Sequence, residues 1–384
     1  MTGFEILGLG TALPEHSISQ KSMATFAATC VLPELRGSKN PSALIEVLYR
    51  RAGVQSRHSV LLESSSEDEA TAQRFFKFVS DADDHGPGTA ERMNRFEQES
   101  PRLAFSSSSA AIAESGVSAS DITHLITVSC SGFSAPGFDI SLIRDLGLSQ
   151  SVARTHVGFM GCHAALNGLR VAHAFAAADP NAVVLLCAVE LCTLHHQYGW
   201  DPQRIVANSL FADGAAAIIG RAVIKPSATL PADSGDLPSM NKSGIGCLVD
   251  SASYVIPDTH EMMTWRVGNN GFEMSLSPEV PGVITRVLPE VLKEFLKRNG
   301  LNLADIQSWA IHPGGPRILS ATAEAAGLSE KMMNPSVSIF QACGNMSSPT
   351  VLFILDKLRS QNAQLPCVML GFGPGLNVEI ALLK

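Results

Sequence analysis

Apolar and polar positions follow a strand-then-helix rhythm through the first 224 residues of the chain. The run 182–190 has almost no polar residue, which is typical of a strand buried on both faces in the middle of a sheet. Apolar residues at helical spacing follow several such runs. The pattern predicts strands at 4–10, 124–130, 155–160 and 182–190, a turn and strand at 211–220, and helices over much of 15–105, at 105–114 and at 141–146. This alternation indicates a layered α/β fold.

The rest of the chain repeats this order after the segment 225–244, which is rich in Pro, Ser, Asp and Gly. We expect that segment to be a crossover between two halves or a surface loop. Beyond it the pattern predicts strands at 247–249, 308–312, 366–371 and 377–383, a strand-like run at 336–340, helices at 281–299, 318–327 and 347–359, and a glycine loop at 371–375. The similar order of elements indicates a pseudo-duplicated architecture.

Composition narrows the classes of protein that fit. Of the 384 residues, 45% are hydrophobic and 17% charged, enough for a large core in one big domain or two fused halves. The net charge of −8, with no basic block, argues against nucleic acid or an anionic membrane as a partner. The acidic stretch 62–97 is expected to be a solvated face or a mobile excursion. The first residues lack a signal-peptide pattern, and no apolar run reaches the roughly 20 residues of a membrane span.

The eight cysteines are scattered singly, without a Cys-x-x-Cys pair or a ligand spacing with histidine. This argues against structural zinc and a disulfide framework, and fits a reducing cytoplasm. Cys162 stands apart, because it follows an apolar run and Gly161 and precedes a small-residue helical stretch. We expect it at a sharp strand-to-helix turn, on the first residues of the helix. Free backbone N–H groups and the helix dipole favour a nucleophilic thiolate there, although a buried structural cysteine is the alternative.

Two polar residues stand where a core would not need them. His312 ends an apolar strand and precedes Pro-Gly-Gly-Pro, whose glycines allow close approach of another segment or a ligand. Asn345 lies between the strand-like run 336–340 and a helix. Taken alone, a satisfied buried histidine and a helix cap would explain them. Together with Cys162 they form a Cys/His/Asn set in which each member lies at the end of an element.

The chain resembles one branch of the thiolase-fold condensing enzymes, the type III polyketide synthases or chalcone-synthase-like enzymes. Four motifs in order carry the resemblance, Gly-Cys at 161–162, and the segments 311–319, 344–349 and 371–375. It is clear from about residue 120 to the end and thinner before it. It implies a layered αβαβα fold of two pseudo-duplicated halves, 1–224 with the nucleophilic cysteine and 225–384 with the catalytic histidine and asparagine.

The resemblance also implies the chemistry. Members of the family load an acyl-CoA starter on a cysteine, here Cys162, and extend it by decarboxylative condensation with malonyl-CoA. They release a cyclised pyrone or phenolic product. His312 would pair with the thiolate, and His312 and Asn345 would donate hydrogen bonds to the enolate that decarboxylation leaves. Neither a metal nor an organic cofactor is implied, and the protein is expected to be a homodimer.

Further positions match substrate-binding stretches of the family. Phe211 and Phe272 match the gate between the CoA tunnel and the cavity, although core packing would also explain them. Basic residues would meet CoA phosphates, and small or polar residues would shape the cavity. The resulting candidates are Arg50, Arg51 and Arg57 for CoA, Ala135 in a loop that crosses the dimer interface, Cys192, His195 and Ser347 along the cavity, and Gly373, Pro374 and Gly375 in the glycine loop. We expect His163, next to the nucleophile, to be structural.

Other members of the fold are the alternatives. A single-step 3-ketoacyl synthase III-like enzyme or an acyltransferase, fed by a carrier protein, would use the same three residues. A thiolase needs another cysteine in the C-terminal glycine loop, and 371–375 contains none. A non-catalytic binding protein on this scaffold is disfavoured by the intact Cys/His/Asn set. The starter, the number of extensions and the mode of ring closure stay open.

Overall fold

The computed structural model describes residues 2–32, 41–65, 72–224, 239–240 and 245–384. Most of the predicted crossover, 225–244, and residues 66–71 of the acidic stretch lie outside the described residues. The strands are β1 (Thr2–Ala12), β2 (Ser17–Ser19), β3 (Ser56–His58), β4 (His124–Ser129), β5 (Ala153–Gly158), β6 (Val183–Leu191), β7 (Asp213–Ile224), β8 (Gly246–Val255), β9 (Met263–Gly268), β10 (Gly271–Leu276), β11 (Ser308–Ile311), β12 (Cys367–Gly373) and β13 (Asn377–Leu383). The helices are α1 (Gln20–Thr29), α2 (Pro41–Ala52), α4 (Thr89–Ser115), α5 (Phe138–Leu146), α6 (Ala164–Ala178), α7 (Pro202–Leu210), α8 (Val280–Arg298), α9 (Pro316–Ala326), α10 (Glu330–Cys343) and α11 (Thr350–Ser360).

Nine of the described strands form one sheet in the order β11-β12-β13-β8-β1-β7-β6-β4-β5. Strand β1 joins its two parts, because it pairs antiparallel with β7 on one side and with β8 on the other. Strand β6 lies between β4 and β7 and is buried along almost its whole length, as its apolar sequence predicts. Strand β5 is the edge at one end, and its burial pattern is largely exposed.

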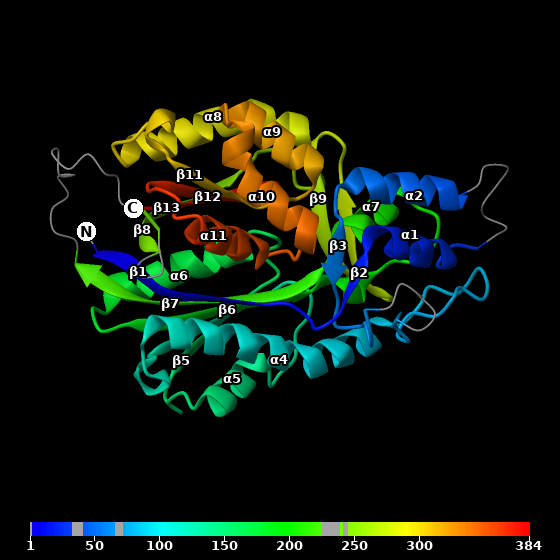
Figure 1. The fold of residues 1–384 in the computed structure, drawn as a ribbon, viewed down its shortest axis with the longest axis horizontal. Coiled ribbons are helices and arrows are strands. Elements are labelled where there is room, and N and C mark those ends of the chain that lie inside the picture. The colour runs from blue at the N-terminus through cyan, green and yellow to red at the C-terminus, as the bar shows by residue number, and fades with distance from the viewer. Residues whose placement is uncertain (1, 33–40, 66–71, 225–238, 241–244) are drawn as a thin grey trace.

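The elements stack in five layers (Figure 1). Helices α8 and α9 cover the outer face of one part of the sheet, and α4 and α5 cover the outer face of the other. Helices α6 and α11 lie between the two parts and share one apolar core with both. This arrangement is the predicted αβαβα fold. Helices α1, α2 and α7 form a side lobe beside the layers, with strands β2 and β3 next to it.

Two predictions of local structure are wrong. Residues 336–340 are not a strand but belong to α10, because Met333, Ser336, Phe340 and Cys343 are buried at helical spacing. The prediction followed the β-branched residues in this run, whereas burial against the core decides the element. Residues 15–105 are helical only in part, since β2 precedes α1, and β3 and irregular backbone separate α2 from α4.

The glycine-rich segment 371–375 is also not a simple loop. Gly371 and Gly373 pair with Glu379 and Asn377 as part of β12, so the turn into β13 is shorter than predicted. A side chain on either glycine would collide with His163, because an added Cβ would lie 2.7 and 2.4 Å from its nearest atoms. These glycines therefore allow β12 to pack closely against the start of α6.

Candidate active site

Cys162 lies in the turn between β5, which ends at Gly158, and α6, which begins at Ala164. It therefore stands just before the helix rather than on its first residues. Gly161 has φ +85°, and a Cβ there would lie 2.3 Å from Pro374 Cδ, so glycine is required. Its backbone N–H donates to Cys130 Sγ at 3.0 Å, and Cys130 Sγ donates to its carbonyl at 3.4 Å. The turn that presents the thiol is thus fixed from both sides.

Asn345 lies between α10 and α11, where its backbone runs beside the segment that carries Phe211. Its N–H donates to Leu210 O at 2.8 Å, and Ala212 N donates to its carbonyl at 2.9 Å. The side-chain Oδ1 accepts from Ser347 N at 2.8 Å, so the amide nitrogen is the side-chain atom left to donate. Its side chain reaches Cys162.

His312 follows β11 and is fully buried. Its backbone N–H donates to Leu370 O at 2.8 Å, which holds the residue against β12. Neither ring nitrogen has a hydrogen-bond partner among the described residues. Burial, with a smaller contribution from the charge of His163, lowers the pKa of His312 to about 3. A neutral imidazole with two free nitrogens can take a proton or donate one to a substrate.

The Cys162 thiol is not acidic in this resting state. Burial raises its pKa to about 11, and the charge of Glu190 adds to the rise, while hydrogen bonds from Ser347 and Asn345 oppose it. Burial therefore favours the neutral thiol over the predicted thiolate in the unliganded protein. A base must take the proton when the thiol attacks, and His312 is a base without hydrogen-bond partners among the described residues.

Glu190 is a buried charged residue beside Cys162 that the sequence did not predict. It is fully buried and accepts hydrogen bonds from Cys130 N, Ser131 N and Ser131 Oγ, at 2.9, 2.9 and 2.6 Å. Ser348 Oγ donates to its other oxygen at 2.8 Å. Burial raises the pKa of this carboxyl, and the hydrogen bonds from these donors oppose the rise. The signal in the sequence was a single charged residue ending the apolar run 182–190.

Cys162 and Glu190 line a small inner cavity of about 30 Å³, whereas His312 and Asn345 do not. Five predicted site residues line it, namely Cys162, Cys192, Phe211, Ser347 and Pro374. The other lining residues are Cys130, Ser131, Gly161, Glu190, Met263, Thr264, Trp265 and Met274. Trp265 Nε1 donates to Cys130 O at 2.8 Å, and the centroids of the Trp265 and Phe211 rings lie 5.9 Å apart. The wall is therefore aromatic and held in place. No group of three or more His, Cys, Asp or Glu in the described part of the chain is placed to hold a metal.

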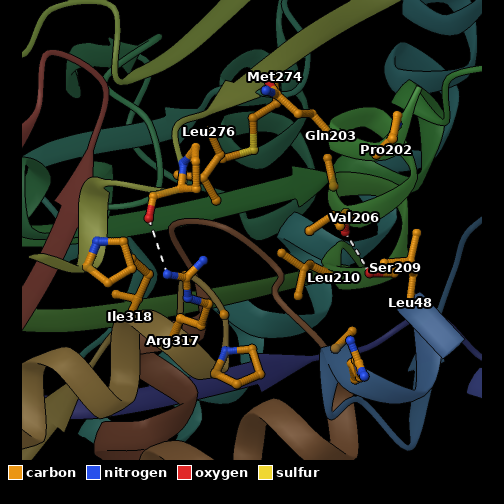
Figure 2. Close-up of a pocket in the computed structure, with 18 of the residues that line it drawn as sticks. Leu48, Pro202, Gln203, Val206, Ser209, Leu210, Met274, Leu276, Arg317 and Ile318 are labelled. Atoms are coloured by element: carbon orange, nitrogen blue, oxygen red, sulfur yellow. Dashed lines mark hydrogen bonds between the residues drawn. The ribbon is translucent and has the colours of Figure 1, made fainter.

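A larger outer cavity of about 390 Å³ opens between the side lobe and the layers (Figure 2). Its wall is mostly apolar and includes Leu48, Val206, Leu210, Leu276 and Ile318. Two arginines line it, the predicted Arg51 and the unpredicted Arg317. Arg317 Nη2 donates to Pro278 O at 3.3 Å, the hydrogen bond drawn beside it in Figure 2.

Met274 lies at the junction of the two cavities, because it lines both of them. Phe272, predicted as part of the gate, does not line either cavity. It is fully buried, and its ring stacks on His195 at 4.2 Å. Side chains alternate along β10, so Met274 lies on the same face as Phe272, two positions later, and reaches the junction of the cavities. Phe272 contacts the cavity only through Trp265, whose ring lies 5.8 Å away.

His195 and Arg57 are structural and do not reach a substrate. His195 Nδ1 accepts from Phe272 N at 2.9 Å and its Nε2 donates to Ser131 O at 2.7 Å, and burial lowers its pKa to about 3. The buried Arg57 guanidinium donates to Asn208 O at 2.9 Å and to Phe211 O at 2.6 Å, so it fixes the backbone of Phe211. Its assignment to CoA phosphates is wrong, because its donors face these carbonyls away from the outer cavity.

The remaining candidates lie outside both cavities. Arg50 is exposed on α2 beside Arg51, and Ala135 is exposed in the loop after β4. Gly373 lies in β12 under His163. Gly375 has φ +117° in the following turn, and its carbonyl accepts from Thr259 Oγ1 at 3.2 Å. These two glycines shape the turn that brings Pro374 to the inner cavity.

A layered α/β fold with Cys162 in the wall of an inner cavity, together with a buried histidine and asparagine, fits a condensing enzyme of the thiolase type. Sequence models of chalcone and stilbene synthases match residues 3–222 with the N-terminal domain and residues 247–384 with the C-terminal domain. The chain therefore belongs to the chalcone and stilbene synthase family, and it is a type III polyketide synthase. Such an enzyme uses acyl-CoA and malonyl-CoA as substrates.

Individual relatives support this family assignment. The chain is 30% identical over 379 residues to the alpha-pyrone synthesis polyketide synthase-like Pks18 of Mycobacterium tuberculosis, covering 97% of this chain and 89% of that protein. It is 29% identical over 386 residues to 1,3,6,8-tetrahydroxynaphthalene synthase of Streptomyces peucetius subsp. caesius, covering 100% and 93%. The crystal structure of PKS-I from the brown alga Ectocarpus siliculosus superimposes with a TM-score of 0.86 at 28% identity, covering 100% of this chain and 98% of that one. None of the described helices is long and apolar enough to cross a membrane.

Proposed function

We propose that Cys162 carries the growing polyketide. Its Sγ attacks the thioester carbonyl of the starter acyl-CoA while His312 takes the thiol proton, and the CoA thiolate leaves with that proton. The supporting observations are a neutral thiol in the wall of the inner cavity and a buried imidazole that lacks hydrogen-bond partners among the described residues. The thiol gives an acyl-enzyme in a small apolar cavity, which protects the thioester from water.

Extension then uses the same residues in a second role. Malonyl-CoA loses carbon dioxide, and the electron pair of the broken bond moves onto the thioester carbonyl as an enolate. Asn345 Nδ2 and a protonated His312 nitrogen donate to that oxygen, so they stabilise charge that develops only in the transition state. The enolate carbon attacks the Cys162 thioester and releases the thiolate. We expect this sequence to need no metal or organic cofactor, because the donors themselves stabilise the enolate.

The outer cavity is the proposed path for CoA thioesters. Its apolar wall suits the pantetheine arm, and Met274 and Phe211 flank the passage to Cys162. Arg51 and Arg317 would meet CoA phosphates at the mouth.

Substitution of Arg51 or Arg317 by alanine should raise the KM for malonyl-CoA by about two- to fivefold and leave kcat nearly unchanged, as expected for exposed ion pairs. Added salt should weaken wild-type binding in the same direction. Steady-state kinetics over a range of ionic strength measures both effects. Arg50→Ala is the matched control, because this arginine is exposed next to Arg51 but does not line the cavity. An equal effect of Arg50→Ala would contradict the assignment.

We further propose a homodimer formed through the edge strand β5. Phe133, Phe159 and Met160 are 54%, 40% and 40% exposed beside the turn that carries Cys162. The rings of Phe133 and Phe159 lie 6.3 Å apart, so they form one apolar surface. A second copy would cover this surface and pair with the exposed edge. No disulfide links the eight cysteines of the described residues, which supports a reducing, cytoplasmic location.

Phe159→Asp should convert the dimer to monomer and reduce product formation, because it places a charge in the apolar interface. Residue 159 has φ +57°, a conformation that aspartate tolerates. Sedimentation velocity measures the mass. Phe105→Asp is the control, since Phe105 is also 40% exposed but lies on α4. A monomeric wild-type protein, or a Phe159→Asp protein that stays dimeric, would rule out this interface.

The product proposed is a cyclised pyrone or phenol. Two relatives are named for the synthesis of an alpha-pyrone and of tetrahydroxynaphthalene, and both span this chain almost completely. Mass spectrometry of products from labelled malonyl-CoA and a panel of acyl-CoA starters, without a carrier protein, tests this proposal. Products that gain two or more two-carbon units would support it. A single condensation, or none until a carrier protein is added, would favour a 3-ketoacyl synthase III-like activity.

A further inference from the structure

His163 follows the nucleophile directly and lies against β12. Its side chain is buried, and its ring occupies the space left free by Gly371 and Gly373. A Cβ at residue 373 would lie 2.5 Å from its Nε2. The face of β12 that carries these two glycines thus leaves room for the imidazole of His163, the residue after Cys162.

Both ring nitrogens of His163 are engaged. Nδ1 lies 2.7 Å from Asn167 Oδ1, and Nε2 lies 3.3 Å from Asn377 Nδ2. Glu379 sets the direction of these contacts, because Asn167 Nδ2 and Asn377 Nδ2 donate to its Oε1 at 2.9 and 3.0 Å. Arg170 Nη1 pairs with the other oxygen at 2.7 Å. A carboxylate only accepts, so both amide nitrogens must face it.

This arrangement selects one form of His163. The Asn167 oxygen requires a proton on Nδ1, and the Asn377 amide hydrogens require a lone pair on Nε2. A proton added at Nε2 would point at the amide group of Asn377. The charged and titratable groups around the ring in the described structure are Arg170 and Glu379 together with Cys162 and His312.

The ring of His312 differs from that of His163 in its hydrogen bonding. Neither of its ring nitrogens has a hydrogen-bond partner in the described part of the chain. The two imidazoles lie near enough for a charge on His163 to oppose a charge on His312. Only a neutral His163 lets His312 become an imidazolium when it takes the thiol proton.

We propose that Asn167, Asn377 and Glu379 hold His163 as a neutral positioning residue, which anchors the nucleophile turn to β12 and β13 and leaves His312 as the only base for Cys162. This inference rests on the proposed roles of Cys162 and His312. It adds that the adjacent histidine is kept out of the proton transfer by its hydrogen bonds.

The test is the rate at which iodoacetamide alkylates Cys162 at pH 7, measured by peptide mass spectrometry. His312→Ala should slow alkylation, because the thiol then lacks its base. Adding Asn377→Leu removes the donor at Nε2 and frees His163 to take a proton beside Cys162. The His312→Ala/Asn377→Leu protein should therefore regain at least about threefold in rate over His312→Ala alone. A third substitution, His163→Gln, should remove that gain.

Controls separate this effect from unfolding. Ser253→Ala removes another contact of Asn377, at 3.3 Å, but leaves the contact with His163, so it should give no gain in the His312→Ala background. Thermal unfolding of each variant shows that the fold is kept. No gain from Asn377→Leu, or a gain that persists with His163→Gln, would overturn the inference. If His312→Ala does not slow alkylation, the proposed role of His312 fails instead, so the two failures are distinct.

Discussion

Cys162→Ala abolishes polyketide formation but leaves decarboxylation of malonyl-CoA partly intact. The substitution removes the atom that carries the acyl chain. The hydrogen-bond donors that stabilise the enolate, His312 and Asn345, stay in place. Acetyl-CoA should therefore accumulate from malonyl-CoA while no chain of two or more added units forms. Liquid chromatography with mass spectrometry measures both products in one assay.

Cys192→Ala is the matched control for this prediction. Cys192 lines the same inner cavity, but burial raises the pKa of its thiol well above the usual value, with the charge of Glu190 adding to the effect. It should remain a passive wall residue, so its loss should alter the product pattern at most and keep chain formation. Polyketide made by Cys162→Ala, or none made by Cys192→Ala, would show that the nucleophile is wrongly assigned.

Asn345→Asp lowers both decarboxylation and chain extension by roughly a hundredfold, the usual loss when one donor to a developing oxyanion is removed. The aspartate keeps an oxygen that accepts from Ser347 N, the contact now 2.8 Å long, and keeps the size of the side chain. It cannot donate to the enolate when ionised, and its charge repels that oxygen. Rates of carbon dioxide release and of product formation measure the two steps.

Asn345→Ala provides the comparison. It removes the contact with Ser347 as well as the donor, whereas the backbone bridge beside Phe211 does not depend on the side chain. If Asn345→Asp and Asn345→Ala lower the two rates by a similar factor, the effect is due to loss of the amide donor. If the Asn345→Asp protein decarboxylates at the wild-type rate, the asparagine has another role.

The strands of the nine-stranded sheet could be predicted, and the three catalytic candidates could be singled out, because their signals are local; β2, β3, β9 and β10 were not predicted. The apolar run of β6 and the breaks before Cys162 and after His312 are visible in a single sequence. Helix α10 could not be recognised, because its β-branched residues match a strand and only burial of Met333 and Phe340 on one side reveals the helix. Local propensity gave way to tertiary packing there.

The cavities could not be predicted because they depend on which faces meet. Met274 and Phe272 are two residues apart on one strand, yet one lines both cavities and the other stacks on a buried histidine. Arg317 and Arg51 come from α9 and α2, which lie far apart in the chain but border the same cavity. Arg57 looked like a surface cation in sequence, and its hydrogen bonds to backbone carbonyls appear only in the fold.

The most direct test of the account is to trap the growing chain on the enzyme. The protein would be incubated with a starter acyl-CoA and carbon-13-labelled malonyl-CoA, quenched with acid within one turnover and digested. Mass spectrometry would then locate the acyl group. The account predicts a thioester on Cys162 that carries the starter, followed by forms heavier by successive labelled two-carbon units. Acyl groups found only on another residue, or a starter on Cys162 that never gains a labelled unit, would contradict it.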